Sequence, residues 1–231
     1  MTASPVRRLP DFVIIGAQKA GTTTLFRWLA DEPEIYMPSQ KEIHFFSRDD
    51  LWKCGFDWYR QCFAGAAPGQ LVGEASTSYT MSDYGSVPAE RMASAMPHAR
   101  LICILRNPEE RLRSHYRHQV VRRRENRSLA EAAGHSMSGY LTTSLYFERL
   151  SPWLERFPRQ QICVVRFEDL IGAGSAAWKT SCATSAWPYG QSPSAHTTPV
   201  GIGPLTFDQS RDLRRAGSSV FATSFHAEPS R

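Results

Sequence analysis

A short segment near the N-terminus combines the residue types that proteins use to bind phosphate. Between Gly16 and Thr24 the chain reads GAQKAGTTT, with a lysine at Lys19 and hydroxyls at Thr22, Thr23 and Thr24. A loop of small residues that leads into a helix presents backbone N–H groups and the positive end of the helix dipole, and both attract an anion. The segment therefore predicts a phosphate-binding loop.

The spacing of this loop differs from that of the nucleotide-triphosphate loop, G-x-x-x-x-G-K-[ST]. Gly16 and Gly21 keep the separation of the two glycines, but the lysine precedes the second glycine, and Thr22 stands in its place. Lys19 therefore lies in the middle of the loop, where it could meet a bridging oxygen. An ATP- or GTP-dependent kinase stays an alternative, weakened because the strands expected next do not end in an aspartate that would hold magnesium.

A second candidate anion site follows a later apolar run. The run from Leu101 to Leu105 ends at Arg106, and Ser114 lies in the helix expected after Pro108. Open α/β sheets bind ligands outside the carboxyl ends of their strands. Because an arginine fork together with a hydroxyl suits a phosphate group, Arg106 and Ser114 are candidates for a second phosphate site.

The elements that must position these residues follow from the apolar pattern. Short apolar runs indicate buried strands, and amphipathic stretches between them indicate helices. We expect strands at 12–15, 71–72, 101–105 and 162–165, and helices at 22–31, 89–95, 109–124 and 141–157. Strands that alternate with helices predict an α/β fold, a P-loop-like three-layer α/β/α arrangement with a central parallel sheet.

The composition fits one soluble domain followed by an atypical tail. The chain has 231 residues, and 27 basic against 22 acidic residues give a net charge of +5, which leans toward an anionic ligand. Since neither an apolar leader nor a run of membrane length stands out, we expect a cytoplasmic protein without a membrane span. We expect residues 1–170 to form the nucleotide-binding domain and residues 171–231, rich in small and polar residues, a poorly ordered tail left by a frameshift or truncation.

Several motifs, in order and spacing, resemble the sulfotransferases that use 3′-phosphoadenosine 5′-phosphosulfate (PAPS), above all the heparan-sulfate-type and related bacterial enzymes. The motifs are GAQKAGTTT, KEIHFFS at 41–47, GEASTSYT at 73–80, LRNPEERLRSHYRH at 105–118 and VVRFEDL at 164–170. The resemblance covers roughly residues 10–170. It implies an enzyme that transfers a sulfuryl group from PAPS, its co-substrate, to a hydroxyl or amine of a carbohydrate, lipid or small metabolite, with no metal required.

The resemblance also implies roles for individual residues. Lys19 would contact the oxygen that bridges sulfur and phosphate, and Arg106 and Ser114 would hold the 3′-phosphate. Glu42 matches the general base of the family and His44 a residue that lines the acceptor site, so the catalytic group would be Lys19, Glu42 and His44. The 5′-phosphosulfate loop would be formed by Gly16, Ala17, Gln18, Lys19, Ala20, Gly21, Thr22, Thr23 and Thr24.

Two features depart from the family pattern. After Leu170 the sequence shows none of the basic, glycine-containing loop that closes over the nucleotide in the family, and Ala75 stands where heparan-type members often have a lysine. A catalytically impaired nucleotide-binding protein therefore stays a second alternative.

The arginine-rich stretch from Arg111 to Arg127 predicts a basic face that either steers an anionic ligand or is merely solvated. His115 and His118 lie one helical turn apart, but a third ligand is not evident, so we expect no metal site. Tyr116 alone does not indicate nucleic-acid binding, which would require aromatic residues among the basic ones. The expected partners are therefore PAPS and an unidentified acceptor.

Overall fold

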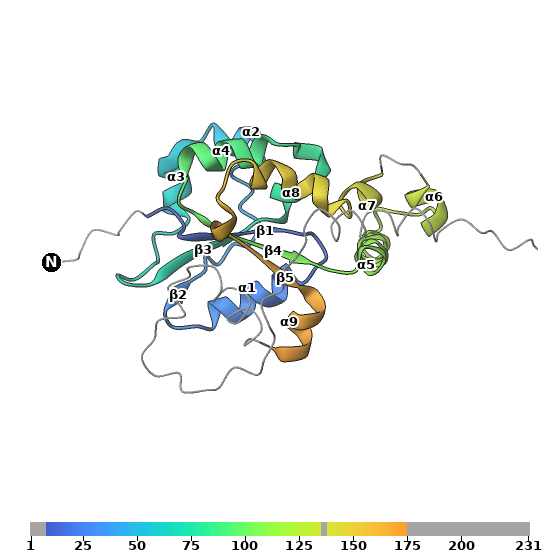
Figure 1. Ribbon diagram of the computed structural model, residues 1–231, viewed down its shortest axis with the longest axis horizontal. Coiled ribbons are helices and arrows are strands. Elements are labelled where there is room, and N and C mark those ends of the chain that lie inside the picture. The colour runs from blue at the N-terminus through green and yellow to red at the C-terminus, as the bar shows by residue number, and fades with distance from the viewer. Residues whose placement is uncertain (1–7, 135–137, 175–231) are drawn as a thin grey trace, which may run out of the picture.

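A parallel five-stranded sheet forms the centre of the computed structural model, which describes residues 8–134 and 138–174 (Figure 1). Its strand order is β2-β3-β1-β4-β5, and every pairing is parallel. Strands β3 and β2 lie on one side of β1, and β4 and β5 lie on the other. The strand order therefore reverses beside β1, where the loop after β1 leaves the sheet. Doubly wound sheets bind their ligands at this point. The strands are β1 (Phe12–Gly16), β2 (Ile35–Tyr36), β3 (Leu71–Ala75), β4 (Arg100–Leu105) and β5 (Ile162–Arg166).

Strand β1 is buried along its whole length because helices cover both faces of the sheet. Side chains of a strand alternate between its faces. Phe12 and Ile14 accordingly pack with α1 (Thr22–Ala30) and α9 (Phe167–Ala173), and Val13 and Ile15 pack with side chains of the opposite layer. The continuous apolar run therefore indicated a doubly covered strand correctly.

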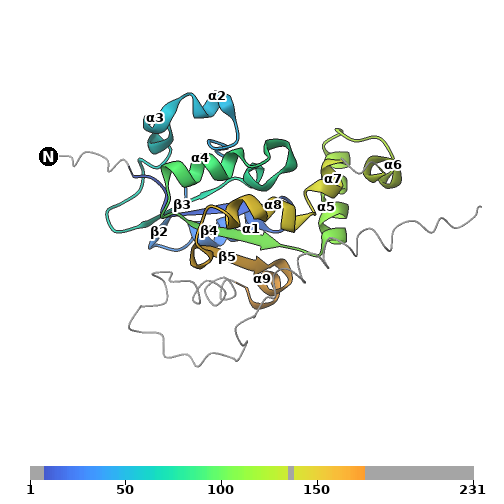
Figure 2. The same ribbon diagram turned by 45° about the horizontal axis from the view of Figure 1, so that its top comes forward.

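The opposite layer and an additional group of helices complete the architecture (Figures 1 and 2). Helices α3 (Gly55–Gln61), α4 (Val87–Ala95) and α8 (Tyr146–Leu154) cover the second face, so the α/β/α prediction is confirmed. Beyond the carboxyl end of β4 lie α5 (Pro108–Val121), α6 (Leu129–Ala133) and α7 (Gly139–Thr142). Shorter elements are α2 (Asp49–Trp52) and three 3₁₀ turns, η1 (Thr77–Thr80), η2 (Ser82–Tyr84) and η3 (Arg159–Gln161).

The helix expected at 141–157 is wrong, because two helices, α7 and α8, occupy this stretch. The break lies at Leu145, whose backbone leaves the helical region with φ −79° and ψ 67°. Immediately before it, the buried Ser144 hydroxyl accepts a hydrogen bond of 2.6 Å from the Arg111 guanidinium. A contact from a distant helix therefore accompanies the break.

The predicted division at residue 170 falls within α9, which continues through Ala173. From residue 175 onward the predicted tail lies outside the described residues. Among the helices of the described ranges, none combines the length and the apolar character needed to cross a membrane.

Candidate functional site

One cavity of about 650 Å³ collects the two predicted phosphate sites and the predicted catalytic group. Lys19, Glu42, His44, Arg106 and Ser114 all line it, although they come from four separate stretches of the chain. A single ligand can therefore touch the loop after β1 and the carboxyl end of β4 at once.

The loop predicted to bind the 5′-phosphosulfate divides into lining and supporting residues. Of the nine predicted positions, Gln18, Lys19, Gly21, Thr22 and Thr23 line the cavity. The supporting positions do not line it: they are Gly16, Ala17, Ala20 and Thr24.

The backbone of this loop leaves a set of donors free. The N–H of Ala17 donates to the carbonyl of Ile104 at 2.9 Å and ties the loop to β4, and the N–H of Ala20 donates back to Ala17 at 3.1 Å. Within the described part of the chain, the lining positions of the loop have no acceptor for their backbone N–H groups; they are Gln18, Lys19, Gly21, Thr22 and Thr23. Unpaired N–H groups at the start of a helix form an anion-binding site.

Glycine is required at the position that starts α1. Gly21 has φ 94°, in the left-handed region, and gives the helix no side-chain cap. A Cβ at this residue would lie 2.7 Å from the Phe167 ring, closer than packing allows. The missing side chain thus lets Phe167 approach the loop and leaves the positive end of the helix dipole open to a ligand.

All three residues of the predicted catalytic group have a left-handed backbone. The φ angles are 68° at Lys19, 64° at Glu42 and 60° at His44, and among the described non-glycine residues Arg123 alone shares this property. L-residues adopt this conformation at a cost of about 1–2 kcal/mol, and such residues cluster at functional sites. Their surroundings must therefore hold these residues in place.

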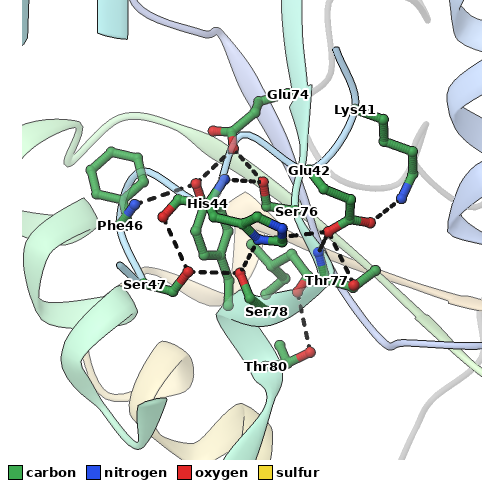
Figure 3. Close-up of polar contacts among 12 residues, drawn as sticks. Lys41, Glu42, His44, Phe46, Ser47, Glu74, Ser76, Thr77, Ser78 and Thr80 are labelled. Atoms are coloured by element: carbon green, nitrogen blue, oxygen red, sulfur yellow. Dashed lines mark hydrogen bonds and ion pairs between the residues drawn. The ribbon is translucent and has the colours of Figure 1, made fainter. Parts of the chain in front are cut away.

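The Glu42 carboxylate is held by donors on both oxygens (Figure 3). Its Oε2 accepts from the backbone N–H of Thr77 at 2.7 Å and from the Thr77 hydroxyl at 3.1 Å. Its Oε1 accepts from the ammonium group of Lys41. Because these partners fix the carboxylate while it still lines the cavity, it can accept a proton from a ligand in a defined direction.

His44 lies beside this carboxylate and is held by a serine. Its Nδ1 is 2.8 Å from the Ser78 hydroxyl and 3.9 Å from Oε2 of Glu42. Burial lowers the pKa of His44, although the negative charge of Glu42 opposes this effect. The neutral imidazole therefore predominates at neutral pH, which suits a group that orients an acceptor.

Cations surround the cavity and repel one another. Burial, followed by the charges of Arg122, Arg106 and Lys41, lowers the pKa of Lys19. A ligand with several negative charges would relieve this repulsion.

Arg106 is oriented by an aromatic ring. Its guanidinium carbon lies 4.5 Å from the centre of the Phe167 ring. Its ion pair with Glu110 is long, at 3.4 Å, and the Glu110 side chain is 53% exposed. The guanidinium is thus positioned by stacking while most of its N–H groups stay available to an anion.

The arginine-rich stretch is not one basic face. Arg111 is completely buried and bonds Ser144 and the carbonyl of Tyr140, whereas Arg122 and Arg124 line the cavity. The helical period places Arg111 toward the packing between α5 and α7, a contact that the sequence pattern did not indicate. No group of three potential metal ligands occurs among the described residues.

Several residues that line the cavity were not predicted from the sequence to be functional. Thr77 and Phe167 both belong to motifs of the resemblance, so their position within those motifs was the available signal. Met81 and Gln119 also line the cavity, and for them the sequence offered no signal.

The comparison with family models finds the sulfotransferase domain, which matches residues 9–173. Among solved structures, that of a sulfotransferase from Alicyclobacillus acidocaldarius is 30% identical, covers 93% of this chain and 92% of its own, and has a TM-score of 0.71.

Curated relatives include heparan sulfate glucosamine 3-O-sulfotransferase 5 of Homo sapiens, 32% identical over 178 residues. That alignment covers 72% of this chain and 50% of the relative, so the chain spans about half of the relative's length. Bifunctional heparan sulfate N-deacetylase/N-sulfotransferase 3 of Homo sapiens is 30% identical over 190 residues, covering 71% of this chain and 20% of the relative.

Proposed function

The chain belongs to the sulfotransferase domain family, and from this premise we propose that it transfers a sulfuryl group from PAPS to a hydroxyl or amine of a carbohydrate. One observation carries the proposal: Lys19 and Arg106 line the same cavity as Glu42. A donor nucleotide with phosphate at two positions needs cations at both ends and a base near the group that is transferred.

The lining of the cavity offers suitable groups for both ends of PAPS. The unpaired N–H groups of the β1–α1 loop would hold the 5′-phosphosulfate, together with Lys19. Arg106 and Ser114 would hold the 3′-phosphate, and the Phe167 ring keeps the guanidinium in place. PAPS supplies an activated sulfuryl group whose leaving group is a phosphate.

Catalysis by these residues would consist of positioning and charge stabilisation, as in phosphoryl transfer. Lys19 would stabilise the charge that develops on the leaving oxygen, an interaction stronger in the transition state than in the ground state. Glu42 would accept the proton of the attacking hydroxyl or amine, a contribution typically of about 10²–10⁴ in rate. Neutral His44 would orient the acceptor beside Glu42.

The acceptor proposed first is a heparan-type polysaccharide, because two relatives carry heparan sulfate in their names. Cations at Lys41, Arg122 and Arg124 on the lining would suit a negatively charged chain. Lipid and small-metabolite acceptors are the alternatives to include in an assay.

Titration calorimetry and a transfer assay test the proposal together. Adenosine 3′,5′-bisphosphate should bind equally well with Mg²⁺ and with EDTA, and ³⁵S-labelled sulfate should pass from PAPS to desulfated heparan sulfate. Mg²⁺-dependent binding of ATP in place of the bisphosphate would support a kinase instead. Bisphosphate binding without transfer to a carbohydrate, lipid or metabolite panel would support the impaired nucleotide-binding protein. The cytoplasmic location and the independence from metal stay predictions.

A further inference from the structure

A buried carboxyl group lies behind the Glu42–His44 segment and takes no part in the proposed chemistry. Glu74, at the end of β3, is completely buried, and among the described residues it has no ion pair with a cation. Three hydroxyls donate to it instead: Tyr79 to Oε1 at 2.6 Å, Ser76 to Oε1 at 2.7 Å, and Tyr59 to Oε2. Burial of a carboxyl group without a cation costs free energy, so we looked for an effect of Glu74 on its neighbours.

Two of these hydroxyls also hold the segment that carries the proposed base. Ser76 Oγ accepts from the backbone N–H of His44 at 2.9 Å (Figure 3). The Tyr79 hydroxyl accepts from the N–H of Phe46 at 3.4 Å. A hydroxyl has one hydrogen to donate and lone pairs to accept with. Because Glu74 takes the hydrogens of Ser76 and Tyr79, their lone pairs are turned toward the backbone N–H groups of the segment.

The segment depends on such contacts for its shape. Glu42 and His44 both have left-handed backbone conformations, which are unfavourable for residues with a side chain. The N–H of Glu42 donates to the carbonyl of Ala75 at 2.9 Å, so β3 and the residues after it hold this segment at several points. Glu74 accepts hydrogen bonds from two of the side chains that make these contacts, Ser76 and Tyr79, but it does not line the cavity.

We propose that Glu74 is a positioning residue: through Ser76 and Tyr79 it holds the Glu42–His44 segment in the conformation that aims the Glu42 carboxylate into the cavity. The inference rests on the proposed function, since it assigns Glu74 an effect on a reaction that Glu42 assists. Burial raises the pKa of Glu74, while the bonds from Tyr59, Tyr79 and Ser76 oppose this shift by favouring the ionised acceptor.

Three substitutions separate positioning from mere stability. Glu74→Met fills similar space without an acceptor, and Ser76→Ala removes the link to His44. Tyr59→Phe is the matched control, because it also removes one hydroxyl from Glu74 but leaves the bonds of Ser76 and Tyr79 in place. Should Glu74→Met fail to fold, the comparison of Ser76→Ala with Tyr59→Phe decides the question.

Kinetics provide the first measurement, with PAPS and desulfated heparan sulfate. Displacement of a reacting group by about 1 Å can cost about 10²-fold in rate. We expect kcat to fall by roughly this factor in Glu74→Met and Ser76→Ala, with the KM for PAPS little changed and with Tyr59→Phe close to wild type. In a Glu42→Gln background the same substitutions should have little further effect, because the group they position is already lost. An equal loss in both backgrounds, or no loss, overturns the proposal.

Hydrogen–deuterium exchange of residues 41–47 provides a measurement that does not depend on activity. Exchange should accelerate in Glu74→Met and Ser76→Ala but not in Tyr59→Phe. In Ser76→Ala the N–H of His44 loses its acceptor, and in Glu74→Met the carboxylate no longer orients the hydroxyls that accept from the N–H groups of His44 and Phe46. If the wild-type protein transfers sulfate to no acceptor, the proposed function fails, and exchange alone decides whether Glu74 holds the segment. Unchanged exchange in both variants overturns the inference.

Discussion

Replacement of Arg106 by alanine should remove the recognition of a 3′-phosphate while leaving the rest of the cavity intact. The guanidinium stacks on Phe167, and its ion pair with Glu110 is long, at 3.4 Å, and partly exposed. Exposed ion pairs between residues i and i+4 of a helix contribute about 0.3–0.5 kcal/mol to stability. Glu110 therefore competes only weakly with a phosphate for the Arg106 guanidinium.

The size of the effect follows from the bonds that would be lost. A hydrogen bond to a charged group contributes about 1.5–3 kcal/mol, and each 1.4 kcal/mol is about tenfold in affinity. The dissociation constant of adenosine 3′,5′-bisphosphate should therefore rise about 10–150-fold in Arg106→Ala. Adenosine 5′-monophosphate, which has no 3′-phosphate, should lose far less affinity.

Isothermal titration of both nucleotides into wild type and variant measures this difference. Arg113→Ala is the control, because Arg113 is 51% exposed, pairs with Glu109 on the same helix and does not line the cavity. It should leave both affinities near wild type. Equal weakening of the two nucleotides by Arg106→Ala would refute the assignment of Arg106 to the 3′-phosphate.

Three further predictions concern the loop and the helix beside it. Lys19→Ala should lower kcat about 10²–10³-fold in a sulfate-transfer assay while circular dichroism stays unchanged, and an unchanged kcat would remove Lys19 from the mechanism. Gly21→Ala should lower Tm more than Gly55→Ala: both glycines have positive φ, but only at Gly21 would the new Cβ meet Phe167, at 2.7 Å. Equal losses would show that this contact is unimportant. Burial is the main reason why the pKa of His115 falls to about 4. In the unfolded chain the imidazole of His115 binds a proton below about pH 6.5, whereas in the folded chain it does so only near pH 4. The free energy of unfolding should therefore drop by roughly 3 kcal/mol as the pH falls from about 6.5 to 4. His115→Gln should flatten this part of the curve in urea unfolding, and an unaltered slope would contradict the assignment.

The strands were predictable because burial on both faces leaves a simple trace in the sequence. The runs at 12–15, 101–105 and 162–165 coincide with β1, β4 and β5 within a residue at each end. Strand β2 was missed because it has two residues, too few for any period to appear. The break between α7 and α8 was missed because the Arg111–Ser144 contact joins residues far apart in the chain.

The candidate site was predictable in its residue types more than in its construction. Glycines around a lysine and an arginine after a strand are local signals, and the structure brings Lys19 and Arg106 to one cavity. The partner of Glu42 could not be inferred, because Thr77 approaches it from another part of the sequence. Nor did the sequence distinguish Glu74 from an exposed glutamate, since burial of a carboxyl group depends on hydroxyls brought together by the fold.

The left-handed backbone at Lys19, Glu42 and His44 shows why these contacts matter for the chemistry. An unsupported loop would relax toward more favourable φ values, and the side chains would then point elsewhere. The Lys19 loop is held by a hydrogen bond to β4, and the Glu42–His44 segment by bonds to β3 and the residues that follow it. Both supports come from the strands that flank β1 in the sheet. The cation and the base are therefore positioned by neighbouring strands of one rigid sheet, so that their separation is set by the fold.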